Sequence, residues 1–184
     1  MTWSVLPSSL TTVPARENPE KVAAPVSAAL STLPEDLPVH VFDIDPDLAD
    51  TAALTEAFGL ELQHSANCVL VAGSRAGEER LAACLVLAHT KADVNKRVKK
   101  LLDVRKCSFM PMDRAVSDSG MEYGGIGPIG LPADWRLLVD ARVLEQPAVV
   151  IGSGVRSSKI VLPGADVARL PQVEVHEDLA IEIG

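Results

Sequence analysis

The residues with the clearest chemical potential form a glycine-rich run, Gly120 to Gly130, which holds five of the chain's twelve glycines. Glycine is used where a backbone takes a positive φ angle or lies bare against a ligand. Pro128 fixes one bend in this exposed backbone. The run therefore predicts a rigid loop that presents main-chain N–H and C=O groups to a bound molecule.

Two short motifs match the letters of known signatures without their structural context. Residues 125–130 spell the dinucleotide motif G-x-G-x-x-G, but residues 131–135 do not continue as the helix that the motif requires. Gly152-Ser153-Gly154 lacks the flanking spacing of the G-x-S-x-G nucleophile elbow. We therefore expect neither a nicotinamide or flavin cofactor nor covalent serine catalysis, and no other cofactor is predicted.

The histidines and cysteines show no metal-binding spacing. These seven residues are scattered along the chain: His40, His64, His89, His176, Cys68, Cys84 and Cys107. Such isolated histidines are typical of surfaces and strand ends, and Cys68 and Cys84 lie in apolar runs that disfavour a thiolate. The sequence predicts reduced core thiols, no metal site and no catalytic cysteine.

A basic cluster lies between Lys91 and Lys106, where seven Lys or Arg residues against two Asp give a local charge of 7 − 2 = +5. The segment begins with Asp93 as a helix cap and carries apolar residues at helical spacing. Its opposite face holds Lys96, Arg97, Lys99 and Lys100. That face is either an ordinary solvated helix surface or a surface that meets phosphates.

Composition limits the class of protein. The 184 residues carry a net charge of −8 and are 47% hydrophobic, which suits one domain with an aliphatic core. The negative charge argues against a protein that coats nucleic acid non-specifically. Neither a signal peptide nor a membrane-spanning run is evident, so we expect a cytoplasmic protein without a membrane partner.

The elements that must position the loop are mostly strands. We expect strands over residues 39–44, 67–72, 81–88, 136–140, 148–151, 159–162 and 172–175, with a polar loop over 73–80 between the second and third. Short helices are expected over 50–58, from Asp93, over 112–117 and over 166–170. This order predicts an α+β fold with a mixed, mostly antiparallel sheet and peripheral helices.

The first 38 residues differ from the rest because they contain six prolines and no glycine. We expect residues 1–38 to form an extension and residues 39–184 to form the domain. Asn18 and Pro19 predict a helix start, and Pro25 is expected to interrupt that helix. Residues up to about Glu17 are expected to be loose, as chain ends usually are.

The order of these elements, with Gly124-Gly125-Ile126-Gly127-Pro128 before Val139-Asp140 and a Gly-Ser-Gly turn before residues 159–162, resembles the YbaK/EbsC family. This family comprises free-standing relatives of the editing domain of bacterial prolyl-tRNA synthetase. The resemblance covers about residues 39–175 and implies a barrel-like sheet. It also implies hydrolysis of the ester that joins a wrongly attached amino acid to tRNA, with an aminoacyl-tRNA synthetase as a further candidate partner.

The resemblance also assigns site residues. Gly124 to Pro128 would position the ester, Phe42 would form a pocket wall, and Asp140 with Gly152, Ser153 and Gly154 would shape the pocket floor. Phe42 is equally interpretable as a core aromatic residue, and Asp140 as a capping carboxylate. Backbone donors of the loop would stabilise the oxyanion of ester hydrolysis, so that no side-chain nucleophile is required.

One position departs from the family pattern. Its best-known members carry a lysine where this chain has Asn67, although one branch shares the asparagine. Asn67 can orient the terminal adenosine or the ester carbonyl but supplies no charge, and Lys91 is a candidate phosphate contact in its place. Two functions therefore remain open, an aminoacyl-tRNA deacylase and a binding module that has kept the pocket without the chemistry.

Overall fold

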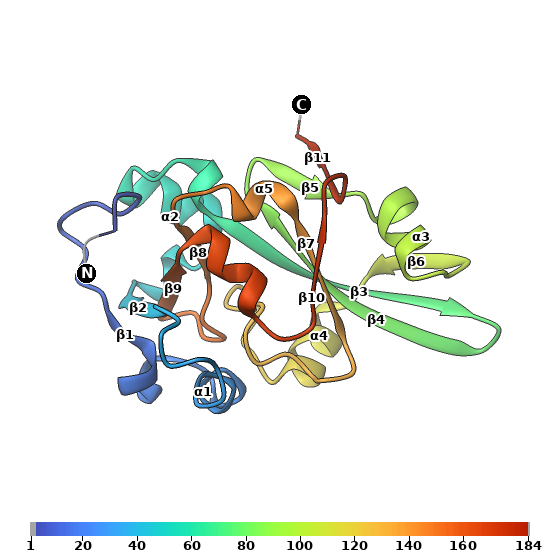
Figure 1. The fold of residues 1–184 in the computed structure, drawn as a ribbon, viewed down its shortest axis with the longest axis horizontal. Helices are drawn as coiled ribbons and strands as arrows, with labels where there is room; N and C mark the ends of the chain where they lie inside the picture. Colours follow the sequence, from blue (N-terminus) through green and yellow to red (C-terminus); the bar gives the residue numbers. More distant parts are fainter. Residues whose placement is uncertain (1–2, 184) are drawn as a thin grey trace.

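The computed structural model describes residues 3–183, which form two main β-sheets with short helices around them (Figure 1). The first sheet is antiparallel throughout. Its order is β1 (Val13–Pro14), β2 (His40–Asp43), β9 (Ser158–Leu162) and β8 (Val149–Gly152). In this sheet Lys159 pairs with Phe42 on one side and with Gly152 on the other.

The second sheet is mixed, because β7 runs parallel to both of its neighbours. Its order is β10 (Val173–His176), β7 (Arg136–Asp140), β4 (Glu78–Leu87), β3 (Ala66–Arg75) and β6 (Lys106–Phe109). A small sheet pairs β11 (Ala180–Glu182) with β5 (Thr90–Ala92). A single parallel bridge from Ser65 to Val150 joins the two main sheets. The predicted α+β class is confirmed, although the sheets do not close into a barrel.

The helices are short. They are α1 (Ala24–Leu30), α2 (Thr51–Phe58), α3 (Lys99–Leu101), α4 (Met112–Ser119) and α5 (Ala141–Leu144), with a π-helix over Val94–Val98 leading into α3. Single 3-10 turns cover Ala15–Glu17, Pro19–Lys21, Pro46–Leu48, Leu62–His64 and Gly164–Arg169. No helix within residues 3–183 is long and apolar enough to cross a lipid bilayer.

Helix α2 is important for the site because its first turn borders the pocket described below. The Asp50 carboxylate accepts a hydrogen bond from the Ala52 N–H at 2.9 Å, and Gly59 ends the helix with a φ angle of 63°. An aspartate N-cap and a left-handed glycine are strong helix boundaries. The helix predicted over residues 50–58 is confirmed.

The β3–β4 hairpin differs from the expected form. Both strands continue through the polar segment that was expected to be a loop, and only Ala76 and Gly77 form the turn, with φ angles of 52° and 85°. Two consecutive positive φ angles give the tight turn that matches strand twist. The prediction of a loop over residues 73–80 was wrong because the polar residues on both sides of Ala76 and Gly77 belong to the paired strands and not to the turn.

The proline-rich segment packs closely on the sheets. Pro25 lies in the first turn of α1 rather than interrupting a helix, because a proline lacks only an N–H that is unpaired there anyway. Val13–Pro14 pairs with β2, and Ala15 is fully buried. The expectation that residues up to Glu17 are loose was therefore wrong for residues 3–17, while Met1 and Thr2 lie outside the described residues. The Ala23 N–H also donates to the Ser153 carbonyl, which ties this segment to the candidate site.

The core lies on both faces of the central strand β4. Ala83, Leu85 and Leu87 face the main cluster between the sheets, while the alternate residues of the strand face a second cluster beneath the π-helix. A strand buried on both faces is expected to be apolar throughout rather than alternating. This two-sided burial holds β3, the neighbour of β4, rigidly at the edge of the pocket.

Candidate active site

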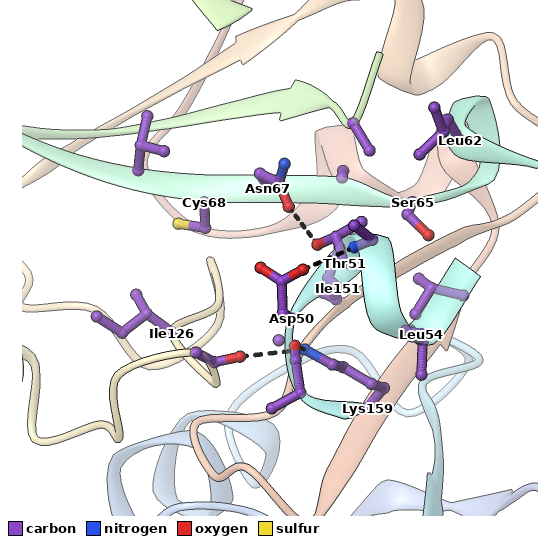
Figure 2. Close-up of a pocket in the computed structure, with 18 of the residues that line it drawn as sticks. Asp50, Thr51, Leu54, Leu62, Ser65, Asn67, Cys68, Ile126, Ile151 and Lys159 are labelled. Carbon is purple, nitrogen blue, oxygen red and sulfur yellow. Dashed lines mark hydrogen bonds between the residues drawn. The ribbon is translucent and has the colours of Figure 1, made fainter. Parts of the chain in front are cut away.

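A cavity of about 440 Å³ lies where the two main sheets meet. Figure 2 shows that it is enclosed by the start of α2, the first residues of β3, the glycine loop and strands β8 and β9. Leu54, Leu62, Val150 and Ile151 supply apolar walls. Its volume is typical of sites for small molecules, and its mixed lining suits a ligand with polar and apolar parts.

The glycine loop is fixed by backbone contacts with the turn after β8. The Gly154 N–H donates to the Gly125 carbonyl at 2.7 Å, and the Glu122 N–H donates to the Gly154 carbonyl at 2.8 Å. A Cβ atom at Gly127 would collide with the Gly152 carbonyl, and Gly124 has a φ angle of 87°. The loop therefore depends on glycine at close backbone contacts and is held rigidly in place.

The predicted loop and turn residues fall into two groups. Gly124, Ile126 and Gly152 line the cavity. The others lie behind that surface, where Gly125, Gly127, Pro128, Ser153 and Gly154 are buried. Ser153 uses its hydroxyl to bind the Ser158 carbonyl at 2.9 Å. Within residues 3–183, the backbone N–H groups of Gly124 and Ile126, two residues of the cavity lining, have no hydrogen-bond acceptor.

Phe42 and Asp140 lie outside the cavity lining. Phe42 is 1% exposed and packs in the cluster beneath α2. The fully buried Asp140 carboxylate caps α5, pairs with the Arg142 guanidinium at 2.7 Å and accepts the Ala180 N–H at 2.9 Å. The structure thus gives Phe42 core contacts and Asp140 capping contacts that anchor the C-terminal strand β11.

Asn67 faces the cavity from β3. Its Oδ1 accepts a hydrogen bond from the Thr51 hydroxyl at 2.7 Å, which links β3 to the start of α2 (Figure 2). Its amide nitrogen has no acceptor within the described residues 3–183. With its oxygen already engaged, Asn67 can offer a ligand two N–H donors but no charge.

Lys159 is a cavity residue that the sequence interpretation did not select. Its side chain enters the pocket from β9 although the residue is only 6% exposed. The Nζ atom donates to the Ala49 carbonyl at 2.7 Å and to the Gly124 carbonyl at 3.1 Å, so it connects α2 to the glycine loop (Figure 2). The available sequence signal was a lysine directly before the apolar run Ile160–Leu162 of a fully buried strand.

The charges around Lys159 set its protonation. Burial is the main cause that lowers the pKa of Lys159; together with the opposing effect of the Asp50 carboxylate and a smaller lowering effect of Arg156, it brings the pKa to about 8. Arg156 itself braces the loop, because its guanidinium donates to the carbonyls of Tyr123 and Pro46 at 3.2 and 2.9 Å. At neutral pH the pocket therefore contains a largely protonated amine opposite a carboxylate.

No conventional nucleophile stands out in the cavity. Cys68 lines it, but burial raises the pKa of this thiol to about 12, which keeps it protonated at neutral pH. No group of three or more histidine, cysteine or carboxylate side chains within residues 3–183 could hold a metal ion. The groups available for chemistry are backbone amides, the Asn67 amide, the Asp50 carboxylate, the Lys159 amine and the Ser65 hydroxyl, which is buried in the cavity lining without a hydrogen-bond partner among the described residues.

The predicted basic face lies at the π-helix, α3 and the neighbouring strands. Lys91, Lys96 and Lys100 are exposed, while Arg97 pairs with Asp178 at 2.7 Å. Lys99 lines a second cavity of about 630 Å³ together with Arg105, Lys106 and Arg114. This second cavity borders β3 at Ala72–Ser74, whereas the first borders the same strand at Ala66–Val69.

The fold and this pocket define a small α+β domain whose cavity is lined by backbone groups of the glycine loop and by one buried amine. Residues 45–170 match the model of the aminoacyl-tRNA editing domain, and the chain belongs to this family. The matched segment contains the glycine loop, Asn67, Asp50 and Lys159.

Solved structures share the fold at low sequence identity. A protein described as a "putative trans-editing enzyme for prolyl tRNA synthetase" is 17% identical, with a TM-score of 0.70 over 87% of this chain and 96% of that one. Hypothetical protein APE2540 is 16% identical, with a TM-score of 0.68 over 77% of this chain and 90% of that one. These similarities establish the fold of the chain.

Proposed function

We propose that this protein is a trans-editing aminoacyl-tRNA deacylase, which hydrolyses the ester of a mischarged tRNA carrying a small amino acid, in the manner of prolyl-tRNA editing. Membership of the editing-domain family and similarity to a structure described as a "putative trans-editing enzyme for prolyl tRNA synthetase" support this function. The observation that carries the proposal is the 440 Å³ cavity, in which Asn67 and the Gly124–Ile126 backbone meet. Its substrate would place the protein in the cytoplasm, with a synthetase as a further partner.

The reaction needs stabilisation of an oxyanion more than it needs a nucleophilic side chain. Water attacks the ester carbonyl carbon, the carbonyl oxygen gains negative charge, and the bond from carbon to the ribose oxygen then breaks. The ribose oxygen takes up a proton, which leaves a free amino acid and an uncharged tRNA 3′ end. Fixed donors such as the Gly124 and Ile126 N–H groups can stabilise the oxyanion, because they need no reorganisation during the reaction.

Asp50 is suited to recognise the α-ammonium group of the aminoacyl ester. One oxygen of its carboxylate is held by the Ala52 N–H, and the residue is exposed at the wall of the cavity. The other oxygen has no hydrogen-bond donor within residues 3–183. A charge-assisted hydrogen bond from an ammonium group would satisfy this oxygen and fix the orientation of the ester.

The surroundings of the cavity suit a tRNA acceptor end. Tyr123 borders the pocket and is 58% exposed, so its ring can stack on the terminal adenine. The basic second cavity borders the same strand as far as Ser74, which lies about 23 Å from Asn67 at a strand rise of about 3.3 Å per residue. Its cations, with those of the basic face, can contact phosphates of the acceptor stem.

A panel of mischarged tRNAs tests this function directly. Wild-type protein should deacylate at least one of them, including alanyl- and cysteinyl-tRNA for proline, faster than buffer under single-turnover conditions. Correctly charged prolyl-tRNA serves as the control and should remain intact. If no tRNA in the panel is hydrolysed although aminoacyl-tRNA binds, the protein is a binding module and the deacylase proposal fails.

A further inference from the structure

Lys159 is unusual because it is a buried lysine without an acidic partner. Among residues 3–183 no carboxylate lies within ion-pair distance of its Nζ atom, although the residue is 6% exposed. Burying a cation is costly unless its hydrogen bonds are satisfied. Two of its N–H groups are satisfied, by the Ala49 and Gly124 carbonyls. The third has no protein acceptor within the described residues and belongs to a side chain that lines the cavity.

We infer that Lys159 is the catalytic cation of this pocket and that its third N–H donates to the ester carbonyl oxygen as negative charge develops there. This inference rests on the proposed deacylase function. The residues that β3 contributes to the cavity are Ala66, Asn67, Cys68 and Val69, so this strand provides no cation there. Lys159 provides one from β9, a strand of the other sheet.

The position of Lys159 fits this role. Its amine contacts the carbonyl of Gly124, the residue whose own N–H is free to bind the same oxyanion. Asn67 faces the same cavity from β3 and also offers N–H donors. The ester carbonyl can thus be held between donors from two segments, β9 and the glycine loop, whereas the amide nitrogen of Asn67 points away from Lys159 (Figure 2). Donors arranged in advance around a developing charge are the largest contribution in many enzymes.

The hydrogen bonds of Lys159 separate a catalytic role from a purely structural one. A neutral amine keeps two N–H groups, which are enough to hold the Ala49 and Gly124 carbonyls, but it has no third N–H and no charge. Because the pKa of Lys159 is about 8, the third N–H is present at pH 7 and is lost as pH rises through 8. The hydrogen bonds from Lys159 to the Ala49 and Gly124 carbonyls would therefore persist above pH 8, whereas donation to the ester oxygen would not.

The first experiment compares wild-type protein with Lys159→Met, which has similar length and no charge. Single-turnover deacylation at pH 7 should fall about 100-fold or more, as for loss of one oxyanion donor. Lys21→Met is the matched control, because Lys21 is outside the cavity lining and forms a surface pair with Asp43. It should react at the wild-type rate. Wild-type activity in Lys159→Met would overturn the inference.

The second experiment measures the ratio of the wild-type and Lys159→Met rate constants from pH 6 to 9.5. Hydroxide accelerates hydrolysis of the ester equally for both proteins, so its effect cancels in the ratio. Because wild-type protein loses the proposed donor as Lys159 is deprotonated, the ratio should be constant below pH 7 and fall above pH 8. A constant ratio would indicate that Lys159 only holds the Ala49 and Gly124 carbonyls in place. A ratio that rises through pH 8 would indicate that the neutral amine acts as a base. Either result would overturn the assignment of Lys159 as a donor.

A third measurement does not depend on catalysis. An aminoacyl-adenosine analogue with an amide in place of the ester should bind wild-type protein at least tenfold more tightly than Lys159→Met in calorimetry at pH 7. If wild-type protein hydrolyses no tRNA but shows this difference, the deacylase function fails and the Lys159 contact stands. If hydrolysis is normal and both proteins bind and react equally, the Lys159 inference alone fails. If wild-type protein hydrolyses no tRNA and binds the analogue no more tightly than Lys159→Met does, both the deacylase function and the Lys159 contact are ruled out.

Discussion

At the scale of single residues, the pocket combines an asparagine, a carboxylate and an amine, each with hydrogen bonds to fixed protein groups. The Asn67 oxygen is held by Thr51, the Asp50 oxygen by the Ala52 N–H, and the Lys159 amine by two carbonyls. In each case one polar group remains for a ligand. Such positioning by neighbouring groups is what makes a small number of polar residues selective.

Replacement of Asn67 tests whether this residue contributes beyond the family fold. Asn67→Ala should reduce single-turnover deacylation about fivefold, because one hydrogen bond to the substrate contributes about 1 kcal/mol. Thr51→Val is the matched control, since it removes the partner of Asn67 but leaves the amide that faces the cavity. It should have a smaller effect. An unchanged rate in Asn67→Ala would leave Asn67 with a structural role only.

Replacement of Asp50 by asparagine separates its role as the N-cap of α2 from its proposed contact with the substrate ammonium group. Asparagine caps helices as well as aspartate does, so thermal stability should change little. Removal of the charge should raise KM for a free aminoacyl ester about tenfold, with no effect on an N-acetylated ester that lacks the ammonium group. Equal KM changes for both substrates would contradict the ammonium contact.

The same substitution should also affect the protonation of Lys159. Asp50 raises the pKa of Lys159 above the value that burial alone would give. Its removal should therefore lower that pKa, so the decline in the Lys159-dependent rate would begin at a lower pH than in wild-type protein. The pH–rate profiles of Asp50→Asn, with and without Lys159→Met, measure this shift. An unchanged midpoint would show that the two charges are independent.

At the scale of elements, the glycine loop and the turn after β8 act as one unit because their backbones touch. Gly127→Ala would force a Cβ atom against the Gly152 carbonyl, which is backbone and has little freedom to move. We expect about 1–3 kcal/mol of destabilisation and loss of deacylation. Thermal and urea unfolding with single-turnover assays measure the two effects.

Gly77→Ala is a suitable control for this loop variant. Gly77 has a φ angle of 85° in the distant β3–β4 turn, and a Cβ atom there would have open space. The substitution should cost about 1–2 kcal/mol through backbone strain while the folded protein keeps its activity. If Gly127→Ala were as active as Gly77→Ala, the loop geometry would not be important for catalysis.

Much of the fold could be predicted from local sequence signals. Asp50 and Gly59 mark both ends of α2, and apolar runs identify β2, β4, β7 and β9 correctly. The hairpin turn was missed because Ala76 is an unusual residue for a positive φ angle. Strands β5 and β11 were missed because each is only three residues long.

The site was less predictable than the fold because it depends on contacts between distant segments. The glycine content of residues 120–130 indicated the loop, and Asn67 was identified through family resemblance. Lys159 and Asp50 are 109 positions apart in sequence and come close only because the chain just before α2 lies against β9, where the Lys159 Nζ atom donates to the Ala49 carbonyl at 2.7 Å. A single sequence contains no local signal for such an encounter.

At the scale of the whole molecule, the distribution of charge is the main clue to the partner. The chain has a net charge of −8, yet its exposed cations without a described ion pair include Lys91, Lys96, Lys100, Arg105 and Lys106, all within one basic segment. Segregation of this kind allows an acidic protein to bind a polyanion at one place and repel it elsewhere.

This distribution predicts a steep and localised salt dependence of tRNA binding. The double variant Lys96→Gln with Lys100→Gln should weaken binding and reduce the slope of log K against log salt by about 0.9 for each phosphate contact that is lost. Lys21→Gln removes a similar charge outside this segment, where Lys21 pairs with Asp43, and should leave the slope unchanged. Fluorescence titrations between 50 and 200 mM salt, roughly the range in which such effects are large, measure both slopes. Equal slopes for wild-type and double-variant protein would mean that this basic face is an ordinary solvated surface and that the acceptor stem lies elsewhere.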